Sequence, residues 1–420
     1  MEPRRPAKHG AQSTPIAGLE ALLASKEIVI SCGSGGVGKT TTSAAAAAMA
    51  AVRQGGKVLV LTVDPAKRLA NALGLDGIGN TEAQVPPEAF RAAGVRPRGE
   101  LWAAMLDTKQ SWDDLVRRHA PDRRTAAQIL DNKLYANITG RFVQSHEYIA
   151  MERLYELHAT GRYDLIVVDT PPTRNALDFL EAPDRMADFF SSRLLQLLTV
   201  PGRSRLLSFA TKPFYSVADR VLGSQFLSDI AEFFQLFQSM GPGFVERAKA
   251  VDRVLHDSRT TFLVVSTLEA APAHEAEFFL DSLQTMGFHR GGLVLNKVLP
   301  EYLLDEGAGA LASRLHDDSG AIAARLAPTL AGADQAQIRR VLAEVADAFG
   351  NYQVVAQREA ELSSELGARA DVVVRVPYFE SDIHDLRGLL QLGGALFGDA
   401  SIDQGGSGKT SGRGAGGRAT

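Results

Sequence analysis

A glycine-rich segment directly after an apolar run constrains this chain most strongly. Residues 33–40 read Gly-Ser-Gly-Gly-Val-Gly-Lys-Thr and fit the phosphate-binding pattern G-x-x-x-x-G-K-[ST]. The apolar run Ile28–Cys32 precedes this loop as a buried strand would, and the alanine-rich stretch Thr41–Ala51 follows it as a helix would. Glycines let backbone N–H groups turn inward around an anion, and a helix N-terminus adds partial positive charge. The sequence therefore predicts that the chain binds a nucleoside triphosphate.

Individual residues of this loop have separate expected roles. Lys39 brings a full positive charge to the outer phosphates, and the Thr40 hydroxyl can ligate Mg²⁺. A chance glycine turn explains the segment less well, because the strand and the helix flank the loop in the required order. We expect the nucleotide to contact Gly33, Ser34, Gly35, Gly36, Val37, Gly38, Lys39, Thr40 and Thr41.

Short apolar runs recur along the chain, and segments with helical periodicity separate most of them. Continuous apolar strands that alternate with helices predict a parallel sheet covered on both faces. The fold class is therefore a doubly wound, mostly parallel α/β sheet. The expected strands are Ile28–Cys32, Val58–Val63, Leu101–Leu106, Leu165–Val168, Phe262–Ser266, Gly292–Asn296 and Val372–Val376.

The chain divides into one large domain and two tails. Residues 1–15 and the Gly/Ser/Arg-rich residues 401–420 are expected to be flexible, which leaves residues 16–400 as the nucleotide-binding domain. Its alternation is interrupted by helical segments, and residues 183–256 form an apolar insertion with nine of the 19 phenylalanines. These aromatic side chains either bind a partner or build the core of the insertion, and the sequence leaves both interpretations open. Residues 301–370 are alanine-rich and charged, and we expect surface helices there.

Composition excludes several classes of function. A net charge of −4 gives no electrostatic footprint for nucleic acid. A single cysteine excludes an internal disulfide and a multi-cysteine metal site within one chain. No apolar run is long enough to span a bilayer, and the polar segment Met1–Thr14 lacks the apolar core of a secretory signal. The expected location is the cytoplasm.

Two expected strands end on aspartate. The carboxyl ends of parallel strands share one edge of the sheet, so Asp64 and Asp169 are expected near the bound phosphates. Asp64 follows Val58–Val63 and would orient the attacking water, although a helix cap before Pro65 is the alternative. Asp169 ends an apolar strand as a Walker B aspartate does and would hold Mg²⁺ through water, and Thr170–Asn175 would sense the outer phosphate.

A third polar residue, Asn296, ends a later strand. Its amide can both donate to and accept from an adenine edge, which predicts a base-binding role. A turn-forming asparagine is the alternative.

Together these segments resemble the ArsA family of P-loop ATPases over about Ile28–Leu390. The family includes arsenite-transport ATPases and guided-entry ATPases of tail-anchored membrane proteins. The resemblance implies ATP hydrolysis with Mg²⁺ by a dimer, with Lys39 and Asp64 in catalysis and nucleotides at the interface. It also implies that Glu269 senses the nucleotide and that Pro377 and Tyr378 belong to a late loop around the base. The matching motifs are the phosphate-binding loop, Asp64-Pro65-Ala66, Asp169-Thr170-Pro171-Pro172-Thr173, the strand ending at Asn296, and Val376-Pro377-Tyr378-Phe379 with Asp382-Ile383.

Three departures from the family pattern limit the functional prediction. Ser34 stands where family members carry a lysine that reaches the phosphates of the partner. Arg174-Asn175 stands where the family usually continues with Gly-His, and Arg174 either supplies that missing charge or is an ordinary surface arginine. Cys32 is the single thiol, whereas arsenite and interfacial zinc both require several.

The resulting functional prediction is an ATPase whose dimer closes and opens with nucleotide to act on a protein client or a membrane partner. The alternative is a nucleotide-binding regulatory subunit that depends on a lysine-bearing paralogue, and a heterodimer is modestly favoured over a homodimer. Arsenite efflux is disfavoured by the thiol count.

Overall fold

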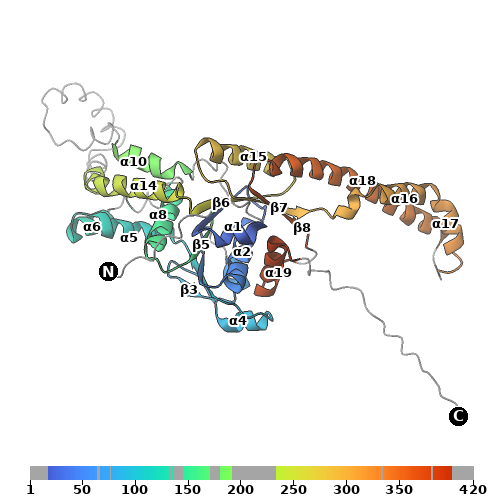
Figure 1. Cartoon of the computed structure of the whole chain (residues 1–420), viewed down its shortest axis with the longest axis horizontal. Helices are drawn as coiled ribbons and strands as arrows, with labels where there is room; N and C mark the ends of the chain where they lie inside the picture. Colours follow the sequence, from blue (N-terminus) through green and yellow to red (C-terminus); the bar gives the residue numbers. More distant parts are fainter. Residues whose placement is uncertain are drawn as a thin grey trace, which may run out of the picture.

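An eight-stranded sheet forms the centre of the computed structural model, with helices on both faces (Figure 1). The structure describes residues 18–63, 67–75, 77–132, 135, 145–170, 180–191, 233–330, 332, 334–379 and 382–399. The strands are β1 (Ile28–Cys32), β2 (Lys57–Thr62), β3 (Ala83–Gln84), β4 (Glu100–Met105), β5 (Leu165–Asp169), β6 (Thr260–Ser266), β7 (Gly292–Val298) and β8 (Val372–Pro377). Their order is β3-β4-β2-β5-β1-β6-β7-β8. All neighbours pair in parallel except β3 and β4, which confirms the doubly wound fold and adds one short strand that the apolar pattern missed.

Strand β1 lies in the middle of the sheet and separates two hydrophobic cores. Ile28 and Ile30 point into the core that α8 (Ser145–Ala159), α14 (Gly241–Leu255) and α15 (Ala270–Thr285) cover. Val29 points into the other core, which α1 (Gly18–Ala24), α2 (Lys39–Arg53) and α19 (Leu386–Phe397) cover. This alternation follows from the two-residue period of a strand, and it explains why both faces of the sequence run are apolar.

Helix α2 packs closely because its buried face is built from alanine. Ala44, Ala45, Ala46, Ala47 and Ala48 are all fully buried. A Cβ atom at Gly393 of α19 would lie 3.0 Å from the Ala45 carbonyl oxygen, so α19 approaches α2 at near-backbone distance. This tight layer fixes the start of α2, where the phosphate-binding loop ends.

Helices at one end of the sheet form a second group, on the left of Figure 1. They are α5 (Thr108–His119), α6 (Arg123–Leu130), α8, α10 (Ala182–Ser191) and α14. Phe244 of α14 stacks on Trp112 and Tyr148 at centroid distances of 6.2 and 5.9 Å, and Phe233 and Phe237 are buried beside it. For Phe233, Phe237 and Phe244 the core interpretation therefore holds. Phe209, Phe214 and Phe226, and the side chains of Phe189 and Phe190, lie outside the described residues.

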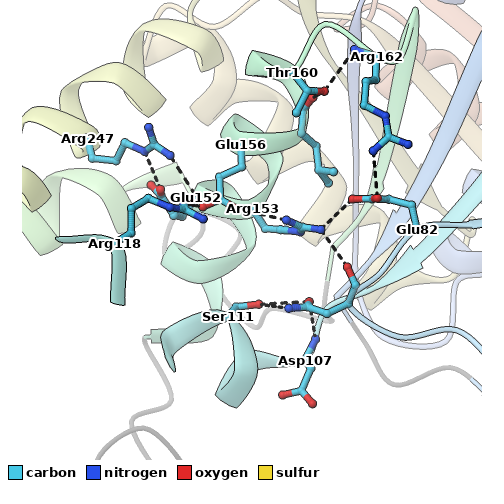
Figure 2. A network of polar contacts seen from close by, with 12 residues as sticks. Glu82, Asp107, Ser111, Arg118, Glu152, Arg153, Glu156, Thr160, Arg162 and Arg247 are labelled. Carbon is cyan, nitrogen blue, oxygen red and sulfur yellow. Dashed lines mark hydrogen bonds and ion pairs between the residues drawn. The ribbon is translucent and has the colours of Figure 1, made fainter. Parts of the chain in front are cut away.

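Ion pairs tie this helical group to the edge of the sheet (Figure 2). Arg153 of α8 donates to Glu82 at 2.8 Å and to the Asn80 carbonyl at 2.9 Å. The preceding residue, Glu152, is 3% exposed and accepts from Arg247 of α14 at 2.6 Å. Burial raises the pKa of Glu152, and the adjacent Arg247 opposes that shift. The charge of Arg247 therefore stabilises the ionised form of the Glu152 side chain in this buried position.

A helical arm leaves the sheet after β7 and returns at β8, on the right of Figure 1. We call residues 301–367 the arm. It consists of η1 (Glu301–Leu304), α16 (Glu306–Asp317), α17 (Ser319–Leu326) and the 33-residue α18 (Gln335–Gly367), along which α16 and α17 pack. The prediction of surface helices in this segment is confirmed. The remaining helices are α3 (Lys67–Ala72) and α4 (Pro87–Ala92).

Within the described part of the chain, no helix combines the length and the apolarity needed to cross a bilayer.

Candidate functional site

The loop between β1 and α2 has a backbone that only glycine supports. Gly33, Gly36 and Gly38 have φ angles of 148°, 81° and 97°, in the region that side chains disfavour. A Cβ atom at Gly33 would lie 2.1 Å from the Val265 carbonyl oxygen, and one at Gly38 would lie 2.5 Å from Asn296 Nδ2. The neighbouring strands thus leave no space for a side chain at Gly33 or Gly38. The loop backbone therefore lies directly against β6 and β7.

This loop opens into a pocket of about 910 Å³ at the carboxyl edge of the sheet. The loop and α2 form one wall, Leu69, Asn71 and Ala72 a second, and the segment after β8 a third. The pocket brings together nine predicted site residues: Gly35, Gly36, Gly38, Lys39, Thr40, Thr41, Asn296, Pro377 and Tyr378. Asp382 and Ile383, which the resemblance of the late loop included, line it too, and so does the neighbouring His384.

Lys39 and Asn296 both bond to the loop backbone. The Lys39 ammonium group donates to the Ser34 carbonyl at 2.7 Å, and Asn296 Nδ2 donates to the Val37 carbonyl at 2.7 Å. Asn296 Oδ1 accepts from the Lys297 backbone N–H at 3.0 Å. The amide that was predicted to read adenine therefore supports the loop in this structure, and its base-reading role stays a prediction.

The buried carboxylate of Asp169 lies at the carboxyl edge of the sheet, where polar side chains from neighbouring elements meet it. Its Oδ2 atom accepts from the Thr40 hydroxyl at 2.6 Å and from the Thr62 hydroxyl at 2.9 Å, and the residue is 0% exposed. Next to it, the Thr170 hydroxyl donates to the Ser31 carbonyl at 2.8 Å. A hydroxyl and a carboxylate that already meet at hydrogen-bond distance are hard oxygen donors, and they fit Mg²⁺.

Thr62 and Lys297 are site residues that the sequence patterns missed. The parallel register pairs Thr62 with Asp169, so a register assignment would have revealed Thr62. Among the described residues, Lys297 is the one non-glycine with positive φ, at 59°, and it lines the pocket. No local sequence signal marks that conformation, which costs about 1–3 kcal/mol and persists only where the surrounding structure imposes it.

Among the predicted site residues that the structure describes, the pocket lining does not include Gly33, Ser34, Val37, Asp169 and Glu269. The first three belong to the loop itself, and Asp169 bonds to Thr40. Glu269 is exposed at the start of α15 and does not line the pocket. Its carboxylate adds to burial in raising the pKa of Glu359 on α18, which places it toward the arm. Asp64 and Arg174 lie outside the described residues.

The cysteine is buried in this structure. Cys32 is 4% exposed at the end of β1, and burial raises the pKa of its thiol to about 12. No group of three or more His, Cys, Asp or Glu side chains among the described residues is arranged to hold a metal ion. The described residues therefore offer one buried thiol, whereas a soft metalloid such as arsenite is bound by several thiolates.

Comparison with known proteins then identifies the class. The family model described as "Anion-transporting ATPase" matches residues 26–320, which include the loop, Asp169 and Asn296. The chain belongs to the ArsA family of ATPases. ATP hydrolysis is therefore its activity.

Relatives of this ArsA-family chain carry differing names. An ATPase ASNA1 homolog of Entamoeba dispar is 23% identical over 294 residues, 68% of this chain and 81% of that protein. A putative arsenical pump-driving ATPase 2 of Aquifex aeolicus is 26% identical over 282 residues, 65% of this chain and 81% of the relative. An uncharacterized Streptomyces coelicolor protein, SCO2128, is 29% identical over 270 residues, 64% of this chain and 62% of its own length.

Proposed function

We propose that this chain is a Mg²⁺-dependent ATPase that couples hydrolysis to opening and closing of a dimer, and so acts on a protein client or a membrane partner. The buried Asp169 carboxylate, bonded to Thr40 of the phosphate-binding loop, carries the proposal. A buried carboxylate beside a phosphate site is unfavourable unless a cation is bound there.

Each polar residue near the phosphate-binding loop then has a role in ATP hydrolysis. Thr40 and Asp169 hold the ion, Asp169 through water, and bound Mg²⁺ neutralises charge that develops on the phosphates. Lys39 exchanges the Ser34 carbonyl for an outer phosphate oxygen, which is the stronger, charge-assisted hydrogen bond. Asp64 orients the attacking water.

The segments around the pocket hold the rest of the nucleotide. Pro377 and Tyr378, with Tyr378 63% exposed, offer the base a partly apolar wall beside Asn296. Glu269 senses the nucleotide from outside this pocket, on the side of the sheet that joins the arm.

The dimer is proposed as a heterodimer with a lysine-bearing paralogue. Charge supplied across an interface is worth about 10³-fold or more in phosphoryl transfer, and Ser34 supplies none. A homodimer with Arg174 in this role, and a purely regulatory subunit, are the competing forms. Relatives named as arsenical pump-driving suggest a transport partner, but the buried Cys32 thiol argues against arsenite as the cargo.

The test measures steady-state ATP hydrolysis of the purified chain with and without Mg²⁺. The isolated chain should be slow, and Ser34→Lys should raise its turnover because the lysine is restored in the position that the family uses. Ser34→Ala is the matched control and should leave turnover unchanged. Fast hydrolysis by the isolated chain that Arg174→Ala removes would contradict the heterodimer. Undetectable hydrolysis in Ser34→Lys and with every paralogue of the same cell would instead favour the regulatory subunit.

A further inference from the structure

Exposed apolar side chains concentrate on the arm. Of 13 large hydrophobic side chains that are exposed among the described residues, ten lie between Tyr302 and Val355. Five of them belong to α18. Val341, Val345, Tyr352 and Val355 are 51%, 55%, 55% and 48% exposed, and Val354 is 67% exposed on another side of the helix. The arm therefore presents a surface that its own helices do not cover.

The spacing on α18 is that of a coiled-coil seam. Val341, Val345, Ala348, Tyr352 and Val355 follow one another at intervals of four and three residues, and Ala348 is exposed like the others. Alternating intervals of four and three place all five on one stripe of a helix and are typical of the a and d positions of a heptad. We call these five residues the seam.

The seam is separate from the face that holds the arm together. Ile338, Ala346 and Ala356 are buried on α18, beside which α16 and α17 pack. His316 of α16 lies 3.5 Å from Asp347, which places α16 along this inner side. One side of α18 thus packs against helices of its own chain. The adjacent stripe is exposed among the described residues and can accept another helix.

We propose that the seam docks against α18 of a second copy of this chain in antiparallel orientation. In an antiparallel coiled coil an a position faces a d position of the other helix. Val345 then faces Ala348 of the second copy, and Val341 faces its Tyr352, so each large side chain meets a smaller one. In parallel pairing, tyrosine would face tyrosine and alanine would face alanine, which packs unevenly.

Charges beside the seam permit the same pairing. The outer flank carries Gln337, Glu344, Asn351 and Arg358 at seven-residue intervals. Antiparallel alignment places Glu344 beside Asn351 of the second copy and Gln337 beside its Arg358. No like charges meet, so nothing on this flank repels a second copy.

The arm is long enough to keep the two bodies apart. From the middle of the seam to Gly367 the helix runs about 20 residues, or ~30 Å at about 1.5 Å per residue, so the bodies lie ~60 Å apart. Eight strands at about 4.8 Å spacing span only ~34 Å. Antiparallel arms therefore meet without collision of the sheets.

This contact differs from the nucleotide dimer proposed above. Five side chains per helix bury less than the roughly 800 Å² per partner of a standard interface, so the pairing is weak and depends on protein concentration. It does not involve the pocket, so it should not require ATP.

Site-directed disulfide formation tests the pairing and its direction. Cys32 is buried with a thiol pKa of about 12, so it contributes little background. Val345→Cys and Ala348→Cys chains should form a mixed disulfide when combined and oxidised, because facing Cβ atoms come within about 4.5 Å. Each variant alone should react at least about tenfold more slowly, since like positions do not face each other in this arrangement. Crosslinking of each variant with itself would overturn the antiparallel pairing, and no crosslink in any combination would overturn the proposal.

Sedimentation equilibrium supplies the second measurement, with a matched control on the same helix. Val345→Lys should weaken self-association about tenfold or more because it brings a charge into the seam. Val354→Lys should change it little, since Val354 is 67% exposed and lies on the far side of the helix. Lys39→Ala should retain the association, whereas a nucleotide-dependent dimer would be lost. Equal effects of the two arm variants would refute the assignment of the seam.

Discussion

Truncation of Asn296 tests how β7 supports the phosphate-binding loop. The side chain joins the loop to the strand through the 2.7 Å bond from Nδ2 to the Val37 carbonyl. Val37 is 2% exposed, so Asn296→Ala leaves a buried carbonyl with one hydrogen bond fewer. An unsatisfied buried group costs about 1–3 kcal/mol. If the nucleotide-binding geometry of the loop bears about half of that cost, nucleotide binding weakens about two- to twelvefold, because ~1.4 kcal/mol is a factor of ten.

The identity of the base separates the two roles of Asn296. If the amide supports the loop, Asn296→Ala should weaken ATP and GTP by the same factor, since both use the same phosphate contacts. Titration of the chain with fluorescent analogues of ATP and GTP measures both dissociation constants.

Asn71→Ala is the matched control, because Asn71 lines the same pocket from α3 and is exposed. It should change neither constant by more than about twofold, in line with most exposed substitutions. A loss confined to ATP in Asn296→Ala would refute the loop-support argument and establish that the amide turns to the adenine edge.

Three further predictions concern the catalytic edge, the thiol and the buried ion pair. Asp64→Asn should retain ATP binding and lower turnover on the order of 10²-fold or more in a steady-state assay, whereas Lys39→Ala should lose most of both. Cys32 should react with a thiol reagent at pH 8 only after unfolding; the stability from its neutral thiol is complete below pH 9 and declines as pH rises toward about 12. Arg247→Met should destabilise the fold by about 3–5 kcal/mol in urea titration, because the Glu152 carboxylate is left buried and unpaired.

Controls make each of these outcomes decisive. Equal turnover of Asp64→Asn and the native chain would mean that Asp64 only caps a helix. Rapid labelling of native Cys32, or strong activation of ATP hydrolysis by micromolar arsenite, would show that the thiol is reachable. The double variant Glu152→Gln with Arg247→Met should recover much of the lost stability, and no recovery would mean that packing of Arg247 on the Tyr155 ring, at 4.3 Å, dominates.

The sheet and the phosphate-binding loop were predictable because their signals are local. Fully buried parallel strands are apolar throughout, and a glycine-rich loop between a strand and a helix has few other uses. All seven predicted strands are present. The two-residue β3 was missed because a strand of that length has no pattern, and it pairs in the opposite direction.

The two apolar surfaces show the limit of a compositional argument. Phenylalanines in the insertion fit either a binding surface or a core, and the structure shows that Phe233, Phe237 and Phe244 fill a core with Trp112. The composition of residues 301–370 predicts surface helices, and these helices carry most of the exposed large apolar side chains among the described residues. A helix with two adjacent apolar stripes has the same composition whether one stripe or both are covered, so only packing separates these cases.

The strand β7 shows why the site itself could be predicted only in part. Its end bonds in three directions: Asn296 to Val37 of the loop, the Val298 carbonyl from Tyr378 after β8, and the neighbouring Leu299 N–H to Glu359 of the arm. The first of these joins residues 259 positions apart. The sequence identified Asn296 because polar residues at strand ends meet at one edge, but the partner of each polar atom depends on strand order. The side chain that was predicted to bind the base thus also holds the loop in this structure. One N–H of its amide and one lone pair of Oδ1 are used in these bonds, and the second N–H and lone pair are what the amide can offer to a base.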